Sequence, residues 1–201
     1  MSTQSYIHRL HEQSDAGALS FFVFHGTGGD ENQFFDLARQ LRPDARVVAP
    51  RGDVSEGGAL RYFRRTGEGR YDMDDLARRT KAMAAFVAET KGEGKVVGLG
   101  YSNGANILAS VMLEAPDLFD ATVLMHPLIP WVPAPVPGLA GRKILITAGE
   151  RDPICPAPQT QALADYFAAQ GADVEAFWHA GGHEVRNEEL QAIAKFSADV
   201  K

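Results

Sequence analysis

The sequence predicts an α/β domain built on a mostly parallel, doubly wound β-sheet. Short apolar runs alternate with stretches of helical periodicity, and this alternation requires crossover connections between parallel strands. Both faces of such a sheet are covered by helices, so its strands are apolar almost throughout. Neither an internal repeat nor a linker interrupts the pattern, and we therefore expect one domain over residues 1–201.

The strands and helices follow from these two kinds of pattern. Six runs, most of them ended by Gly or Pro, predict buried strands: Phe21–Phe24, Val47–Ala49, Val96–Leu99, Thr122–Met125, Ile144–Thr147 and Val174–Trp178. Four apolar stripes predict helices, around Leu76 to Val87, Ile107 to Met112, Leu163 to Phe167, and Leu190 to Ile193. Asp30 with Gln33 suggests the capped start of another helix that runs to about Leu41, and the segment Tyr6 to Leu10 suggests an edge strand.

Composition excludes several classes of protein. The 201 residues carry a formal charge of −6, and 45% of them are hydrophobic against 23% charged, which is typical of a globular domain. An acidic chain lacks the electrostatic footprint of a general nucleic-acid binder. The single cysteine, Cys155, can form neither an internal disulfide nor a zinc cluster, and no apolar stretch near Met1 resembles a secretory signal. We therefore expect a cytoplasmic protein.

One stretch resembles a membrane span by length alone. Residues 121–141 contain no Asp, Glu, Lys or Arg. Prolines interrupt this stretch at positions 127, 130, 133, 135 and 137, and each removes a backbone donor and blocks a helix. A strand followed by a Pro-rich surface loop fits better, so we expect no membrane span.

Three predicted strand ends carry Ser, Asp and His in that chain order. The segment Gly100-Tyr101-Ser102-Asn103-Gly104 lies between a strand and a helix, the context of a nucleophile elbow, in which a sharp turn exposes the serine hydroxyl. Glycines two residues before and after Ser102 let the strand and the helix pass close to each other. A serine hydroxyl needs a neighbouring base and an acid that orients this base.

Each partner of Ser102 has one rival. His183 lies in the loop after the last predicted strand, behind two glycines, whereas His179 falls at the end of that strand, so we favour His183 as the base. Asp152 lies further into its loop than Glu150 and is followed by a proline, so we favour Asp152 as the acid. The other histidines lie near the N-terminus or precede the acid in sequence.

Acyl transfer also needs hydrogen-bond donors for the oxyanion. The backbone N–H of Asn103, the residue after the nucleophile, is the first candidate. The Gly-rich loop after the first central strand supplies the second, and Thr27 is the residue that we favour. The alternative interpretation of this loop is an ordinary turn.

These residues resemble those of the small carboxylesterase/phospholipase family of α/β-hydrolases, which includes acyl-protein thioesterases and lysophospholipases. The resemblance spans nearly the whole chain and rests on these segments: His25-Gly26 and the loop after it, Ala49 to Gly52, the elbow Gly98 to Asn106, Gly149 to Pro153, and Gly182-His183. Phe63 to Arg65, Tyr71-Asp72, Asp75-Leu76 and the elbow are also similar to a bacterial subgroup of hydroquinone- or quinone-responsive hydrolases.

The resemblance implies an α/β-hydrolase fold with the triad Ser102, Asp152 and His183. It also implies no metal or cofactor and, in many members, a homodimer. Thr27 departs from the Leu that many members have, which makes the pocket wall more polar but keeps the backbone N–H. The brevity of the chain predicts that no separate lid domain covers the site.

Other functions were weighed against this one. A dinucleotide loop would need an acidic residue at the end of the strand after Gly104, where the sequence instead reads Met125-His126-Pro127. No P-loop motif is present. A non-catalytic ligand binder would typically lack part of the triad. Cys155 is a weak nucleophile candidate, because the related dienelactone hydrolases place their cysteine in the elbow.

The substrate is expected to be a small ester. We predict a serine hydrolase of short-chain or aryl carboxylic esters, with an acyl thioesterase or lysophospholipase as the alternative. Arg61, Arg64 and Arg65 could steer an anionic substrate, or form a solvated charged segment. Of these we select Arg64, and from the uncharged loop Leu128–Gly138 we select Trp131, as candidate substrate-binding residues.

Overall fold

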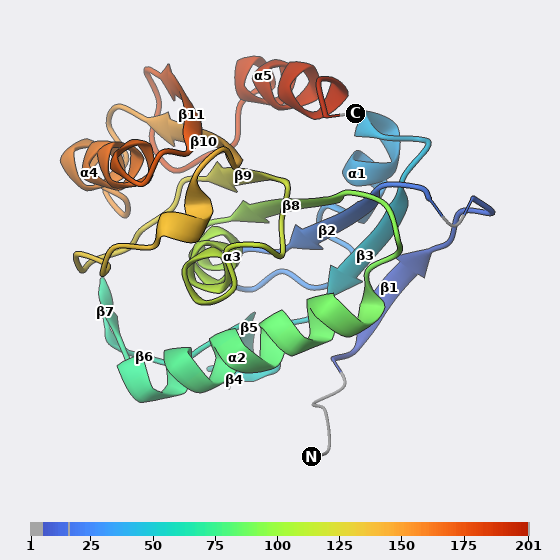
Figure 1. Ribbon diagram of the computed structural model, residues 1–201. Coiled ribbons are helices and arrows are strands. Elements are labelled where there is room, and N and C mark those ends of the chain that lie inside the picture. Colours follow the sequence, from blue (N-terminus) through green and yellow to red (C-terminus); the bar gives the residue numbers. More distant parts are fainter. Residues whose placement is uncertain (1–5, 16, 201) are drawn as a thin grey trace.

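The computed structural model describes residues 6–15 and 17–200 of the chain. A seven-stranded sheet in the order β1-β3-β2-β8-β9-β10-β11 forms its centre (Figure 1). The strands are β1 (His8–His11), β2 (Ser20–Phe24), β3 (Arg46–Pro50), β8 (Val96–Tyr101), β9 (Ala121–Met125), β10 (Lys143–Gly149) and β11 (Asp173–His179). All pairs are parallel except β1 with β3, which confirms the mostly parallel sheet and the N-terminal edge strand.

Helices cover both faces of this sheet, as Figure 1 shows. One core lies under α2 (Met73–Thr90), α3 (Asn103–Glu114) and α4 (Ala157–Ala169), and the other lies under α1 (Phe35–Leu41) and α5 (Asn187–Ala198). Because side chains alternate along a strand, β2 contributes to both: Phe22 and Phe24 pack in the first core, Phe21 and Val23 in the second. All five residues of β2 are buried, which explains its continuous apolar run.

Between β3 and α2 the chain forms two small hairpins that the sequence analysis did not predict. The first pairs β4 (Val54–Glu56) with β5 (Ala59–Arg61), and the second pairs β6 (Arg65–Gly67) with β7 (Arg70–Tyr71). Their strands have only two or three residues each, too few for a period-2 pattern to be recognised. We call residues 54–71 the hairpin segment.

The predicted start of the first helix is wrong. The α1 helix begins at Phe35, not near Asp30, and Phe34 at its N-terminus makes no side-chain cap. The carboxylate of Asp30 instead accepts the N–H of Asn32 in a local turn, and the side-chain oxygen of Gln33 accepts the N–H of Gly26 at 2.8 Å. Both side chains therefore hold the loop after β2 rather than cap a helix.

The sequence predicts neither a membrane span nor a separate lid domain. Within the described residues no helix is long and apolar enough to cross a membrane. The uncharged stretch of residues 121–141 forms β9, a loop, and the short 3-10 helix η1 (Pro137–Leu139). In the described part of the chain no separate lid domain is present, as predicted.

Candidate active site

Ser102 lies on the sharp turn between β8 and α3. Its backbone has φ 52° and ψ −116°, a left-handed conformation that non-glycine residues rarely adopt, and its N–H is bonded to the carbonyl of Met125 at 2.9 Å. The glycines on either side are required by packing. A Cβ on Gly100 would lie 2.5 Å from the carbonyl oxygen of Gly104, so strand and helix can cross only without these side chains. Local structure thus matches that of a nucleophile elbow.

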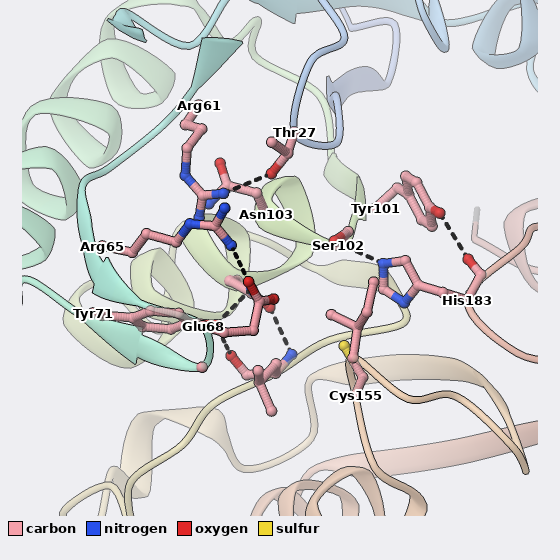
Figure 2. Close-up of a pocket in the computed structure, with 14 residues that line it drawn as sticks. Thr27, Arg61, Arg65, Glu68, Tyr71, Tyr101, Ser102, Asn103, Cys155 and His183 are labelled. Carbon is pink, nitrogen blue, oxygen red and sulfur yellow. Dashed lines mark hydrogen bonds and ion pairs between the residues drawn. The ribbon is translucent and has the colours of Figure 1, made fainter. Parts of the chain in front are cut away.

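His183 and Asp152 complete a hydrogen-bonded chain with Ser102. The Nε2 atom of His183 lies 2.9 Å from the Ser102 hydroxyl, and its Nδ1 lies 2.7 Å from Oδ2 of Asp152. The ring of His183 is held from two sides, because Tyr101 packs against it at 5.4 Å between centroids and donates its hydroxyl to the backbone carbonyl of His183 at 2.7 Å. Figure 2 shows this bond and the one to Ser102.

The two rival residues lie elsewhere. Glu150 is exposed on the loop after β10. His179 is buried at the end of β11, where its Nδ1 accepts the N–H of Gly181 at 3.1 Å and its Nε2 faces Glu189 at 3.6 Å. The structure therefore brings to Ser102 the histidine and the acid that the sequence analysis favoured.

The carboxylate of Asp152 is fully buried, and both of its oxygens accept two hydrogen bonds. Its Oδ1 accepts the N–H groups of Ile154 and Cys155 at 2.8 and 2.9 Å, while Oδ2 accepts from His183 and from a second histidine, His126, at 3.0 Å. Burial opposes ionisation of this carboxyl, but these hydrogen bonds outweigh it and keep its pKa below the ordinary value. The acid is thus held as a carboxylate.

His126 is the site residue that the sequence analysis missed. It precedes the acid in the chain, which excludes it as the base of the triad, yet it follows β9 directly and so lies at the same sheet edge as Ser102 and Asp152. Its other ring nitrogen, Nε2, lies 3.3 Å from Oε1 of Glu189, a fully buried residue of α5. Its position at a strand end was the available signal.

The predicted oxyanion residues lie at the pocket. Thr27 and Asn103 both line it. The N–H of Asn103 belongs to the first turn of α3 and has no partner within that helix. The side-chain oxygen of Asn103 accepts a hydrogen bond from the N–H of Tyr62 at 2.8 Å. The Thr27 hydroxyl accepts one from Nη1 of Arg61 at 2.9 Å (Figure 2). The hairpin segment therefore holds both residues in place.

A pocket of about 360 Å³ opens above Ser102. Its walls offer polar and apolar surface in similar amounts and are formed by Thr27, Arg61, Arg65, Glu68, Gly69, Tyr71, Tyr101, Asn103, Asn106, Leu128, Ile154, Cys155 and His183. Figure 2 shows the two arginines entering from the hairpin segment, opposite His183. Burial lowers the pKa of Arg61 from its ordinary value, although the guanidinium remains a cation near neutral pH.

The two predicted substrate-binding residues do not line this pocket. Arg64 is exposed between β5 and β6, where its backbone N–H is bonded to Oδ2 of Asp75 at 2.8 Å. Trp131 packs edge-on against Tyr71 at 6.2 Å and faces a separate groove, so only Leu128 of the Pro-rich loop reaches the site. The neighbours of Arg64, by contrast, include Arg65, which does line the pocket.

A cluster of buried ligand-type residues lies behind the site, but its tautomers do not suit a metal. The imidazoles of His126 and His179 and the carboxylate of Glu189 approach one another closely enough to surround an ion. However, Nδ1 of His179 accepts an N–H, so its Nε2 carries the proton and faces Glu189. A metal ligand must present a lone pair at that atom.

The fold and the Ser102–His183–Asp152 arrangement define an α/β-hydrolase. Residues 58–198 match the dienelactone hydrolase family, and the chain belongs to this family. It is 37% identical over 174 residues to the Bacillus subtilis protein named "Putative hydrolase MhqD", with 84% of this chain and 87% of the relative covered. The family and this relative establish a hydrolase.

Two solved structures are also similar. A protein of unknown function from Agrobacterium tumefaciens has a TM-score of 0.92 and 53% sequence identity, with 100% of both chains covered. A carboxylesterase from Bacillus cereus has a TM-score of 0.91 and 32% identity, with 97% of this chain and 94% of that chain covered.

Proposed function

We propose that this chain is a serine carboxylesterase that cleaves short-chain or aryl esters of small carboxylic acids. The observation that carries the proposal is the continuous hydrogen-bonded chain from the Ser102 hydroxyl through His183 to a buried, ionised Asp152, opening into a small pocket. Similarity to a carboxylesterase supports the same reaction class.

The geometry accommodates the usual two-step acyl transfer. His183 takes the proton from the Ser102 hydroxyl as the oxygen bonds to the ester carbonyl carbon, and Asp152 stabilises the imidazolium that forms. His183 then gives this proton to the departing alcohol, which leaves an acyl-Ser102 ester. Water, deprotonated by His183, attacks that ester and releases the acid with Ser102 restored.

Charge on the carbonyl oxygen needs fixed donors. We assign this role to the N–H groups of Asn103 and Thr27, the first in the opening turn of α3 and the second in the loop after β2. Removing one such donor typically costs about 10²–10³ in rate. The Arg61–Thr27 and Tyr62–Asn103 hydrogen bonds support the assignment, because they fix both residues before a substrate binds.

Pocket size and charge favour small substrates. The volume of about 360 Å³ lies at the lower end of the range for ligand pockets, and Arg61, Arg65 and Glu68 place charged groups along its walls. A lysophospholipase or long-chain thioesterase would need a longer apolar channel. A short-chain thioesterase remains the alternative candidate, because the same triad attacks either kind of carbonyl.

The proposal is tested by covalent labelling and a substrate panel. A fluorophosphonate should label the wild-type protein on the Ser102 peptide, and Ser102→Ala should abolish the mass shift while Ser55→Ala, an exposed control on β4, retains it. Turnover should be fastest on acetyl, propionyl and aryl p-nitrophenyl esters and should fall with chain length. Preference for long-chain thioesters or lysophospholipids would contradict the proposal.

Three expectations stay predictions. The cytoplasmic location can be checked by cell fractionation. The homodimer can be checked by measuring the molar mass in solution with light scattering coupled to size-exclusion chromatography. The absence of a cofactor requirement can be checked by assaying ester cleavage after exhaustive dialysis against a chelator, which should leave the rate unchanged.

A further inference from the structure

Backbone strain singles out one residue besides the nucleophile. Among the described non-glycine residues, positive φ occurs at Ser102, with 52°, and at His126, with 50°. Each follows a central strand directly, Ser102 after β8 and His126 after β9. Strained backbone of this kind persists where the surrounding structure enforces it and is concentrated at functional sites. The strain at His126 sets the direction in which its imidazole enters the protein interior.

The imidazole of His126 bridges two buried carboxylates. Its Nδ1 lies 3.0 Å from Oδ2 of Asp152, and its Nε2 lies 3.3 Å from Oε1 of Glu189. All three side chains are fully buried. An ionised carboxylate only accepts hydrogen bonds, so both ring nitrogens must donate, and His126 is then an imidazolium.

The surroundings of Glu189 favour its ionised form. Its carboxylate accepts the Thr147 hydroxyl and the backbone N–H of Arg186, and the protonated Nε2 of His179 faces it at 3.6 Å. Burial raises the pKa of this carboxyl, but bonds from His126 and Thr147 outweigh burial and lower it. Burial alone would lower the pKa of His126, but the two carboxylates outweigh it and raise that pKa.

Seven of the described residues pack around His126, and two of them, Asp152 and Glu189, are carboxylates. The seven come from β8, β10, β11, α5 and the loops after β10 and β11, and they are Tyr101, Thr147, Asp152, Cys155, His179, His183 and Glu189. Burial raises the pKa of Tyr101 to about 12, so this phenol is neutral, and burial likewise raises the pKa of the Cys155 thiol. The guanidinium of Arg186 pairs outward with Glu184 and Glu188.

We propose that His126, held as a cation between Asp152 and Glu189, positions Asp152 and weakens its pull on the proton of His183, so that Ser102 remains reactive at a lower pH than an isolated Asp–His pair would allow. The inference rests on the proposed function, since it assumes that His183 is the base. His126 and Glu189 are positioning residues, because they reach the substrate only through Asp152 and His183.

The physical basis is the sharing of one oxygen. Oδ2 of Asp152 accepts from both His126 and His183, and the two rings lie 5.2 Å apart between centroids. A cation at this distance opposes protonation of His183, which must be neutral to act as a base. The hydrogen bond from His126 also helps to fix the orientation of Asp152, together with His183 at Oδ2 and the two N–H groups at Oδ1.

A charge series tests the proposal without requiring turnover. The readout is the pH dependence of the rate at which a small fluorophosphonate labels Ser102, measured for wild type, His126→Gln, Glu189→Gln and the double variant. His126→Gln removes the cation and should raise the midpoint of the acid limb by about one to two pH units. In Glu189→Gln the amide oxygen can still accept from Nε2 of His126 and Asp152 still stabilises the cation, so the variant removes only the more distant anion and should lower the midpoint by about half a unit. The double variant should fall between wild type and His126→Gln.

Matched controls separate charge from mere disruption. His11→Gln on β1 and Glu188→Gln, the outward neighbour on α5, should leave the midpoint within about 0.2 units, since neither side chain belongs to the cluster. A structural role alone would change the rate at every pH and would not shift the midpoint in opposite directions. Midpoints that stay unchanged, or shift in the same direction in both single variants, would overturn the proposal.

A second measurement covers variants that fail to fold. In wild-type protein with ¹⁵N-labelled histidine, NMR at pH 8 should show both ring nitrogens of His126 protonated, with assignment through contacts to the rings of both Tyr101 and His179. A neutral His126 with one bare nitrogen would overturn the proposal. If the fluorophosphonate labels wild type and the variants show the midpoint shifts, but wild type cleaves no ester or thioester, only the proposed function fails. If wild type cleaves esters and the variants show no shifts, only this inference fails. An unlabelled wild-type protein would overturn both.

Discussion

The two walls of the pocket are built differently. The wall that carries His183 and Asp152 rises from the carboxyl ends of the central strands and is supported from behind by the buried cluster of His126 and Glu189. The opposite wall is the hairpin segment, which lies outside the main sheet and holds Arg65 through its pairs with Glu56 and Glu68 at 2.9 and 2.8 Å. Glu68 is largely exposed.

The two walls should therefore differ in how many substitutions they tolerate. Removing one partner from a buried ion pair leaves an uncompensated charge and typically costs about 3–5 kcal/mol, whereas exposed pairs contribute about 0–1 kcal/mol. The triad wall should therefore tolerate few changes. Exposed positions of the hairpin wall, such as Glu68, can vary without loss of the fold, whereas Arg61, Tyr62 and Phe63 of the same segment are buried. We expect the exposed positions to influence which substrates bind.

The largest effect is expected at the nucleophile. Ser102→Ala should lower kcat on p-nitrophenyl acetate by about 10⁴–10⁶, as in other serine hydrolases, because no other group supplies the attacking oxygen. Thermal unfolding followed by circular dichroism should change little. Substantial activity in this variant would show that the chemistry does not belong to the triad wall at all.

The next effect separates the two candidate acids. Asp152→Asn should lower kcat by about 10³–10⁴, since the amide no longer holds His183 in the productive tautomer. Glu150→Gln, an exposed control two residues earlier, should change kcat less than threefold by the usual weakness of surface charges. Steady-state rates of both variants decide the assignment, and a larger loss at Glu150 would reverse it.

Stability should distinguish the walls directly. Glu189→Ala leaves the His126 cation with one buried partner fewer and should reduce the free energy of unfolding by about 3–5 kcal/mol. Glu68→Ala, on the exposed face of the hairpin segment, should reduce it by less than about 1 kcal/mol. Urea denaturation measures both. Equal losses would mean that the hairpin wall is as constrained as the triad wall.

The buried cluster also predicts how stability depends on pH. The pKa values of Asp152 and Glu189 are lowered in the folded protein, so their contribution is present above about pH 4 and is lost as the pH falls below that value. The pKa of His126 is raised, so its contribution is complete below about pH 6.5 and is lost as the pH rises through its higher folded value. Unfolding midpoints measured from pH 3 to 10 should therefore be highest near pH 5 to 7, and Glu189→Gln should flatten both sides.

The smallest effect is expected at the hairpin wall. Arg65→Ala should leave kcat on a neutral ester within about threefold but lower the ratio of kcat/KM for an anionic to a neutral ester by about three- to tenfold, because a partly screened cation is lost from the pocket. Arg64→Ala is the matched control, since Arg64 is exposed and does not line the pocket. An unchanged ratio at Arg65 would exclude this wall from charge selection.

Much of the fold and the triad could be predicted because their signals are local. Each central strand is an apolar run. The elbow needs small residues at Gly100 and Gly104, and the whole motif lies within five consecutive positions. The hairpin segment could not be predicted in the same way. Its strands are too short to show a period, and whether Arg61, Arg64 or Arg65 faces the pocket depends on where the segment docks.

The sequence by itself determined the alternation of strands and helices that gives the mostly parallel sheet, and it indicated His183 and Asp152 as the two partners of Ser102. Only the tertiary structure decided that His126, which lies 26 residues before Asp152, shares an oxygen of that acid, and that Glu189 on α5 closes the cluster from behind. The physical reason is that parallel strands bring their carboxyl ends to one edge regardless of chain distance. A buried histidine between two carboxylates therefore carries no local signature and is recognised only when the partners are seen together.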